Sequence, residues 1–365
     1  MLRVLPGPKH SLYGVAATRQ IEQLAQATRP EHDLMQRAGL AVARLALALA
    51  PHAQRIWLAC GPGNNGGDGL EAALHLQRWG KQPVVTWLGD STRAPADALA
   101  ALQRATAAGV SIVEQPPAQA DLCVDALLGI GSQAREPVRR MADWIKQMNG
   151  CGAPILAVDV PTGLNADSGA ACALHIKAQH TLSLLTLKPG QFTAQGRDAC
   201  GQLWLDDLGI GPDLRHRVPA TARLVAHPEL PLRAHASHKG SFGDVAVLGG
   251  APGMTGAALL AATAALHAGA GRVFVALLED LSQSVDVTQP ELMFRPWRRL
   301  DFAQLTLVCG CGAGTAVQQV LPHVLACAAP LVLDADALNA IAADRSLQAL
   351  LRGRAGTSVL TPHPL

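Results

Sequence analysis

The sequence has 365 residues, of which 49% are hydrophobic and 16% are charged. This length suits two domains better than one, and the apolar content excludes an intrinsically disordered chain. The chain has 30 Lys and Arg against 28 Asp and Glu and no basic run, so its charge indicates neither nucleic acid nor an anionic membrane as partner. We therefore expect it to act on a small molecule.

Apolar stretches and cysteines indicate a cytoplasmic protein. The longest apolar stretch, near residues 40–51, contains Arg44 and is shorter than the ~20 residues of a membrane-spanning helix. The Pro-Gly-Pro segment at residues 6–8 interrupts the region where an export signal would be apolar. The eight cysteines include no CxxC pair, which favours reduced, mostly buried thiols over a disulfide framework or a zinc site.

The first part of the chain has the pattern of a Rossmann-like three-layer α/β/α domain. Two helices come first, at residues 19–27 and 34–50, and then strand-length apolar runs alternate with helix-length segments. This alternation predicts βαβ units and a parallel sheet with helices on both faces. Strands are expected at 56–60, 84–88, 122–127, 155–158, 181–187 and 202–205, and helices at 70–79, 95–108 and 137–148.

A change of composition separates a second domain. Pro, Arg and His without periodicity predict a linker at residues 213–237, between a first domain at 1–212 and a second at 238–365. The α/β alternation then restarts, with strands expected at 245–248, 272–277, 305–309, 331–333 and 358–360, and helices at 255–267, 315–328 and just after Asp336.

The predicted strand at 56–60 runs into a glycine-rich segment, residues 61–69, and then a helix. Glycines allow a close backbone approach, and the free N–H groups at a helix N-terminus favour a phosphate. The alternative is a tight turn, because Gly and Asn tolerate positive φ. The segment also matches G-x-G-x-x-G, and Asp90 follows the next strand, which keeps an NAD(P)-dependent dehydrogenase as an alternative function.

Two acidic residues lie at predicted strand ends. Asp125 comes near the end of the strand at 122–127, and Asp159 directly follows the strand at 155–158. Ligands of open α/β sheets bind outside the carboxyl ends of the strands, so these residues and the glycine-rich segment are expected to converge. Taken singly, each acid is as consistent with a helix cap or a turn.

Four segments occur in the order seen in NAD(P)H-hydrate epimerases, which interconvert the two C6 epimers of hydrated, damaged nicotinamide dinucleotides. They are Leu34–Gly39, Gly63–Gly69, Asp125–Gly129 and Val158–Gly163, and the first domain resembles this family throughout. Gln36 and Ile130 depart from the usual Glu and Thr. The resemblance implies a potassium ion held by Asn65, Asp125 and Thr162, a donor set that suits a hard cation of low charge. It also implies that the hydrated dinucleotide contacts Asn64, Asn65, Gly66, Gly67, Asp68, Gly129, Ile130, Gly131, Ser132, Gln133, Ala134, Arg135 and Asp159.

This substrate suggests an acid–base role for one carboxylate. Inversion at C6 passes through a planar or ring-opened intermediate, and either route moves a proton on or off the C6 hydroxyl. Asp159 is the candidate for this general acid–base step. Lys188 is a weaker candidate, which we interpret as a solvated lysine at a strand end.

The second domain resembles the ribokinase-like ADP-dependent NAD(P)H-hydrate dehydratase. The residues that carry the likeness are 238–243, 249–257, 334–339 and 361–364. The resemblance implies substrate contacts by Ala257, Gly314 and His363, ADP or ATP as nucleotide, possible use of Mg²⁺, and a homo-oligomer. Its Cys309–Gly314 segment departs from the family pattern.

No glycine-rich turn after Phe242 ends in the aspartate that ribokinase-like enzymes use for catalysis. We therefore expect only the N-terminal half of this domain, without dehydratase activity. Besides the dehydrogenase, a non-catalytic dinucleotide-binding module is an alternative reading of the whole chain.

Overall fold

The computed structural model describes residues 1–5, 10–131, 136–137, 139–226, 232–278 and 285–363. The chain divides into two compact units, Met1–Glu229 and Leu230–Leu365. The linker expected at 213–237 is shorter than predicted, because helix α7 (Gly211–His216) and strand β10 (Ala222–Arg223) belong to the first unit. Strand β10 pairs with β2 (Ser11–Leu12), and the intervening Val218 is buried in the core of that unit.

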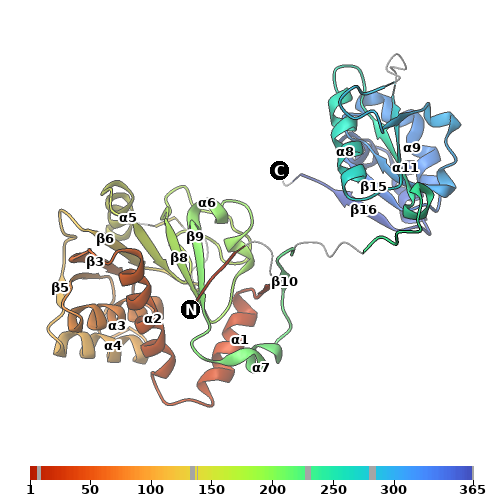
Figure 1. The fold of residues 1–365 in the computed structure, drawn as a ribbon. Coiled ribbons are helices and arrows are strands. Elements are labelled where there is room, and N and C mark those ends of the chain that lie inside the picture. Colours follow the sequence, from red (N-terminus) through yellow and green to blue (C-terminus); the bar gives the residue numbers. More distant parts are fainter. Residues whose placement is uncertain (6–9, 132–135, 138, 227–231, 279–284, 364–365) are drawn as a thin grey trace. The chain divides into compact units, whose positions relative to one another are not determined.

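The first unit is built on an eight-stranded sheet with the strand order of a Rossmann domain (Figure 1). In chain order the strands are β1 (Leu2–Arg3), β3 (Arg55–Cys60), β4 (Gln82–Trp87), β5 (Ser111–Val113), β6 (Leu122–Ala126), β7 (Ile155–Val158), β8 (His180–Leu184) and β9 (Gln202–Asp206). Their spatial order is β1-β9-β8-β7-β6-β3-β4-β5, and only β1 runs antiparallel to its neighbour. The chain builds outward from β3 to β5 and then returns to place β6 on the other side of β3. The topological switch point therefore lies between β3 and β6.

Helices cover both faces of this sheet, as predicted. On strand β3, Ile56 and Leu58 join one buried cluster and Trp57 joins another, because successive side chains point to opposite faces. The first cluster is covered by α2 (Asp33–Leu49), α3 (Asn64–Arg78) and α4 (Ala96–Ala107), and the second by α5 (Arg140–Gly150). Helices α1 (Val15–Gln26) and α6 (Gly196–Cys200) complete the unit.

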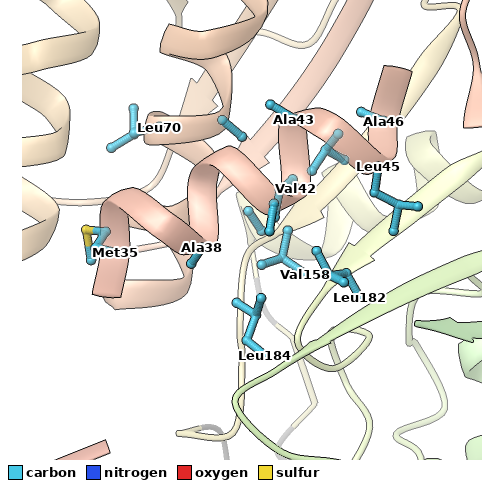
Figure 2. Close-up of a cluster of buried hydrophobic side chains, with 14 of the residues drawn as sticks. Met35, Ala38, Val42, Ala43, Leu45, Ala46, Leu70, Val158, Leu182 and Leu184 are labelled. Atoms are coloured by element: carbon cyan, nitrogen blue, oxygen red, sulfur yellow. The ribbon is translucent and has the colours of Figure 1, made fainter. Parts of the chain in front are cut away.

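Helix α2 forms the centre of the larger cluster. Its buried side chains recur at helical spacing, so that one stripe of the helix faces the sheet. Figure 2 shows this stripe over Val158 of β7 and Leu182 of β8, while Leu70 of α3 packs beside it. The packing fixes α2 against the strand ends that carry the site described below.

The second unit has a six-stranded, fully parallel sheet with helices on both faces. Its strands are β11 (Asp244–Gly249), β12 (Arg272–Leu277), β13 (Met293–Phe294), β14 (Thr306–Cys309), β15 (Leu331–Asp334) and β16 (Ser358–Thr361), in the order β13-β12-β11-β14-β15-β16. Helix α8 (Thr255–His267) packs on one face, and α9 (Val317–Ala326), α10 (Ala335–Ala343) and α11 (Arg345–Arg352) cover the other. These elements confirm the alternation predicted for residues 238–365.

Two predicted boundaries in the first unit are wrong in an informative way. Helix α3 begins at Asn64 and not near Leu70, so the glycine-rich segment forms its first turns. Strand β8 ends at Leu184 and not at Leu187, because the backbone turns sharply at Leu185. None of the described helices combines the length and the apolarity needed to cross a membrane.

Candidate functional site

A cavity of about 430 Å³ opens at the carboxyl ends of β3, β6 and β7. It lies at the topological switch point, where open α/β sheets bind their ligands. The residues predicted at these three strand ends do converge there, since Asn64, Asn65, Asp68, Gly129, Ile130, Gly131 and Asp159 all line it. The wall opposite the strand ends contains Thr18, Arg19, Glu22 and Gln26 of α1, and Asp97 of α4 also lines the cavity.

The glycine-rich segment is the N-terminal part of α3 rather than a separate loop. Asn64 is the first helical residue and Gly63 is the cap, with extended φ and ψ. The first four N–H groups of a helix lack intrahelical partners, and the helix dipole adds partial positive charge. A phosphate in the cavity would therefore meet the free N–H groups of Asn64 and its neighbours.

Two of the predicted binding glycines have a packing role. A Cβ atom on Gly66 would lie 2.0 Å from the carbonyl oxygen of Gly61, and one on Gly67 would lie 2.6 Å from Cε of Met35. Both residues are buried, and neither is among the described residues that line the cavity. They allow α3 to pack closely against β3 and α2, which positions the residues that do reach the cavity.

The loop after β6 contributes Gly129, Ile130 and Gly131. Gly129 leaves little room for a side chain, since a Cβ there would lie 3.0 Å from Oδ1 of Asn65. Gly131 faces α1, with Nη2 of Arg19 3.7 Å from the place of a Cβ. The other predicted contacts of this loop, at Ser132, Gln133, Ala134 and Arg135, lie outside the described residues.

Asp125 and Thr162 form a fully buried polar cluster beneath the cavity. Thr162 donates to Asp125 through its hydroxyl (2.7 Å) and its backbone N–H (2.8 Å), and the Leu127 N–H donates as well (3.2 Å). Burial raises the pKa of Asp125 to about 6, against the opposing effect of these hydrogen bonds. The cluster places a carboxyl group where bulk water does not reach it.

Asn65 completes the group predicted to hold potassium. Among the described residues its side-chain nitrogen is buried without a hydrogen-bond partner, and its amide oxygen lies next to Gly129. The free N–H would need an acceptor, so only the amide oxygen could bind a cation. One carboxylate with neutral amide and hydroxyl oxygens fits a hard monovalent cation, so the donor set passes the chemical test for K⁺. Among the described residues, no group of three or more His, Cys, Asp or Glu side chains could hold a metal ion.

Asp159 is held by an unusual backbone. Its φ is +67°, and the N–H of Val160 donates to the carbonyl of Val158 at 2.8 Å, which makes a γ-turn centred on Asp159. Leu185, after the neighbouring strand, repeats this geometry with φ +62° and a 2.7 Å bond from Thr186 N–H to the Leu184 carbonyl. Such strain in non-glycine residues clusters at functional sites.

The interpretation of Lys188 as a solvated lysine is wrong. Its side chain is completely buried and its ammonium pairs with Oδ1 of Asp159. The same ammonium donates to the Leu184 carbonyl (2.8 Å) and to the Ser183 hydroxyl (3.2 Å). Because the chain turns back after β8, the residue that looked like the end of a long strand points into the interior.

Gln191, in the short 3₁₀ helix at Pro189–Gln191, stabilises the positions of Asp159 and Lys188. Its amide donates to the Asp159 carbonyl and to the Ser183 hydroxyl, each at 2.9 Å, and accepts from the N–H of Lys188 at 3.0 Å. Among the described residues, the donors to the Asp159 carboxylate, Lys188 and the Leu184 N–H, both bond Oδ1. In this part of the chain Oδ2 has no partner and can accept from a ligand in the cavity.

The sequence did not single out Glu22, Arg19 or Asp97 as cavity residues. Glu22 lies one turn after Thr18 and next to Ile21, both of which are buried. A carboxylate beside the apolar stripe of a helix is the signal that was available. Burial and the charge of Asp159 raise the pKa of Glu22, and burial raises that of Asp68 well above its ordinary value.

The comparison with known proteins decides the family. Residues 31–190 match the family model of the YjeF-related protein N-terminus, and residues 245–365 match that of NAD(P)H-hydrate dehydratase. A bifunctional NAD(P)H-hydrate repair enzyme of Coxiella burnetii is 35% identical over 97% of this chain and 74% of its own length. The corresponding enzyme of Vibrio cholerae is 34% identical over 99% of this chain and 75% of its own length. The chain belongs to the family of bifunctional NAD(P)H-hydrate repair enzymes.

A solved structure is similar to part of this chain. The ADP/ATP-dependent NAD(P)H-hydrate dehydratase from Bacillus subtilis, co-crystallised with ATP and Mg²⁺, is 31% identical. The match covers 37% of this chain and 49% of that one, with a TM-score of 0.31.

Membership of the repair family removes the basis of the dehydrogenase alternative. Asp90, expected to bind a ribose, is exposed after β4 and accepts from the N–H and the hydroxyl of Thr92, each at 2.8 Å. It is not among the described residues that line the cavity. The match to G-x-G-x-x-G in this repair enzyme therefore reflects a glycine-rich helix start and not the whole dehydrogenase fingerprint.

In the dehydratase unit of this repair enzyme, the loops after β11, β14 and β15 meet at the carboxyl edge of the sheet. Gly314 has φ +54° and donates its N–H to Asp336 at 2.8 Å. Ala257 lies near the start of α8, where its Cβ would be 2.9 Å from a Cβ on Gly312. His363 is exposed, two residues after β16. The three predicted substrate contacts are thus at one edge of one sheet.

Proposed function

We propose that the first unit interconverts the R and S epimers of hydrated NADH and NADPH. The observation that carries the proposal is the buried Asp159–Lys188 pair, which opens into the same cavity as the N-terminus of α3. An anion-binding helix end and a carboxylate with one unoccupied oxygen are what such a substrate needs.

The cavity suggests how the dinucleotide lies. Its phosphates would bind the free N–H groups at the start of α3, with Asn64 and the loop at Gly129–Gly131 beside them. The hydrated ring would then extend toward Asp159 and α1. The acidic residues at that end suit a neutral ring with hydroxyl and carboxamide groups, because they would repel a phosphate there.

Asp159 moves the proton of the C6 hydroxyl in this proposal. Oδ2 accepts the proton while Oδ1 stays bonded to Lys188 and the Leu184 N–H. The ammonium compensates the negative charge of a carboxylate that is only 7% exposed, and the γ-turn fixes its direction. Lys188 itself has its hydrogen bonds used within the protein, so it acts as a positioning residue.

We propose that Asn65, Asp125 and Thr162 hold a potassium ion. The support is the buried Asp125 carboxylate and the Thr162 hydroxyl bonded to it, with the amide oxygen of Asn65 as a further oxygen donor. A bound K⁺ would supply a fixed positive charge next to the phosphate-binding part of the cavity. The cluster links the loops after β3, β6 and β7, so the ion would also stabilise their relative positions.

The test is the exchange between separated epimers, followed by chromatography, in an Asp159→Asn variant. Loss of one positioned acid–base group costs ~10²–10⁴ in rate, while binding of the hydrated dinucleotide should stay largely intact. Asp198→Asn, which changes an exposed side chain of α6, is the matched control for loss of a carboxylate. Near-normal exchange in Asp159→Asn would contradict the assignment, and absence of exchange in the unaltered protein would contradict the function.

For the second unit we propose that it binds the substrate of the dehydratase reaction, which in this family uses ADP or ATP, with Mg²⁺ as a companion; that the unit lacks dehydratase activity stays a prediction. Support comes from the family match over residues 245–365 and from the convergence of glycine-rich loops at one sheet edge. Ala257, Gly314 and His363 would contact the hydrated dinucleotide. The affinity of the unit for the S epimer, measured by calorimetry, should fall when Ala257 is replaced by Leu. Equal affinity in this variant would contradict the assignment.

Location and assembly are part of the same proposal. All eight cysteines are free and five of them are buried, which supports a reducing compartment such as the cytoplasm. We also propose a homo-oligomer, which sedimentation of the purified chain would test: a single species at monomer mass would contradict it.

A further inference from the structure

Glu22 faces the cavity from the wall opposite the strand ends, on a helix that is firmly anchored. The Thr18 hydroxyl bonds that of Thr186 at 2.8 Å, which fixes α1 against the segment after β8. Residues four apart lie on the same face of a helix, so Glu22 continues the side that Thr18 turns toward the sheet. The Glu22 side chain lines the same cavity as Asp159.

Glu22 has no structural task in the part of the chain that the structure describes. No hydrogen bond or ion pair joins its carboxyl group to another described residue, and it is not a helix cap. A carboxyl group that is partly buried without a partner is unfavourable for stability. Its retention beside the reacting end of the cavity is explained if its partner is the substrate.

The surroundings of Glu22 raise the pKa of its carboxyl group. Burial has the largest effect on its pKa, followed by the negative charge of Asp159, and both raise it above the ordinary value of glutamic acid. Lys188 and Arg19 act in the opposite direction, and Asp97 raises the pKa further. Asp68 on α3 is a second carboxyl neighbour, whose own pKa is raised by burial and by Asp159 and Glu22.

We propose that Glu22 is a second acid–base residue of the epimerase reaction, acting on the ring nitrogen while Asp159 acts on the C6 hydroxyl. The inference rests on the proposed function of the first unit. Two carboxyl groups in different environments can divide the roles of acid and base in this way. Asp159 is compensated by Lys188, whereas among the described residues no cation is bonded to Glu22.

The step balances without water, metal or oxidant. Asp159 takes the hydroxyl proton, the C6–O bond becomes a carbonyl, and the C6–N1 bond breaks. Its electron pair goes to N1, which receives the proton of Glu22, leaving an aldehyde and an enamine. Rotation about the C5–C6 bond presents the other face of the carbonyl. Closure reverses every transfer, so Glu22 regains its proton from N1, and Asp159 returns its proton to the oxygen.

The experiment compares Glu22→Gln, Glu22→Asp and the control Gln23→Ala, which changes the exposed side of the same helix. In the unaltered protein, kcat/KM for epimer exchange should fall at high pH as Glu22 loses its proton. In Glu22→Gln we expect a ~10²–10⁴-fold lower kcat, little change in the Kd of the hydrated dinucleotide, and loss of the alkaline limb.

Glu22→Asp should keep the alkaline limb and recover part of the rate, which a structural role would not do. Exchange within about threefold of the unaltered protein in Glu22→Gln, with the same pH profile, would overturn the inference and leave the proposed function standing. If Glu22→Gln does not fold, loss of the limb in Glu22→Asp overturns it equally. Absence of exchange in the unaltered protein would overturn the proposed function together with this inference.

Discussion

Replacing Lys188 with Met tests the buried ion pair at the centre of the site. Met has nearly the length of Lys, so it fills the same space and removes only the charge and the hydrogen bonds. The Asp159 carboxylate then loses its counter-charge, and the Leu184 carbonyl and the Ser183 hydroxyl lose a donor. The carboxylate must either take up a proton or stay buried and uncompensated, and both lower the free energy of unfolding.

Burial sets the size of the effect. Lys188 is 0% exposed and Asp159 7%, so water screens the pair little. Removing one partner of a buried pair costs about 3–5 kcal/mol, whereas replacing both partners by neutral groups of similar size is close to neutral. For a unit of this size, 1 kcal/mol lowers the midpoint of thermal unfolding by about 2–4 °C. We therefore expect Lys188→Met to lower the Tm of the first unit by roughly 6–20 °C.

The assay is calorimetry together with tryptophan fluorescence. Five of the six tryptophans, at positions 57, 79, 87, 144 and 204, lie in the first unit, so fluorescence reports mainly on its unfolding. The double variant Asp159→Asn/Lys188→Met should be more stable than Lys188→Met alone. A Tm of Lys188→Met equal to that of the unaltered protein would refute the reasoning. So would a double variant that loses the sum of the two single effects.

Three further predictions concern other parts of the chain. Asp125→Ala should weaken the dependence of the Tm and of the exchange rate on potassium, because it removes the only charged ligand proposed. The same Tm and rate in K⁺ and in a bulky organic cation would contradict the site. Gly66→Ala should lower the free energy of unfolding by about 1–3 kcal/mol, because the added Cβ would overlap the Gly61 carbonyl. Unfolding in urea measures this, and an unchanged urea midpoint would contradict the packing. Arg354→Leu should lower the Tm of the second unit and leave epimer exchange unchanged, since Arg354 donates to carbonyls in and after the last turn of α9, those of Val324, Cys327 and Ala329. A change in exchange would show unexpected coupling.

Most of the fold could be predicted because apolar runs carry a strong signal in parallel sheets. Strands β7 and β12 and helix α8 have the predicted boundaries, and the alternation gave the correct layers in both units. The spatial order of the strands could not be predicted from periodicity, since it depends on which edge each crossover returns to. The short edge strands β1 and β5 lack enough residues for a pattern.

In the candidate site, the residues at strand ends could be predicted from the sequence, whereas the residues brought in by tertiary packing could not. The three strand ends could be placed together, because parallel strands have their carboxyl ends at one edge. Glu22 and Lys188 could not be found this way, since their positions depend on tertiary packing of α1 and on the turn at Leu185. The glycines at 66 and 67 look like ligand contacts in the sequence, although close helix packing already explains them.

The two γ-turns also bear on how this domain tolerates change. Each holds a non-glycine residue in a sparsely populated conformation, at a cost of about 1–3 kcal/mol. Leu185→Gly would relieve part of that cost, yet it would free the backbone that turns Lys188 toward Asp159. Selection for a more heat-resistant protein would therefore favour substitutions that lower the activity of the site. Resistance to heat and catalytic power are opposed at these two positions, and directed evolution of the domain should screen for both together.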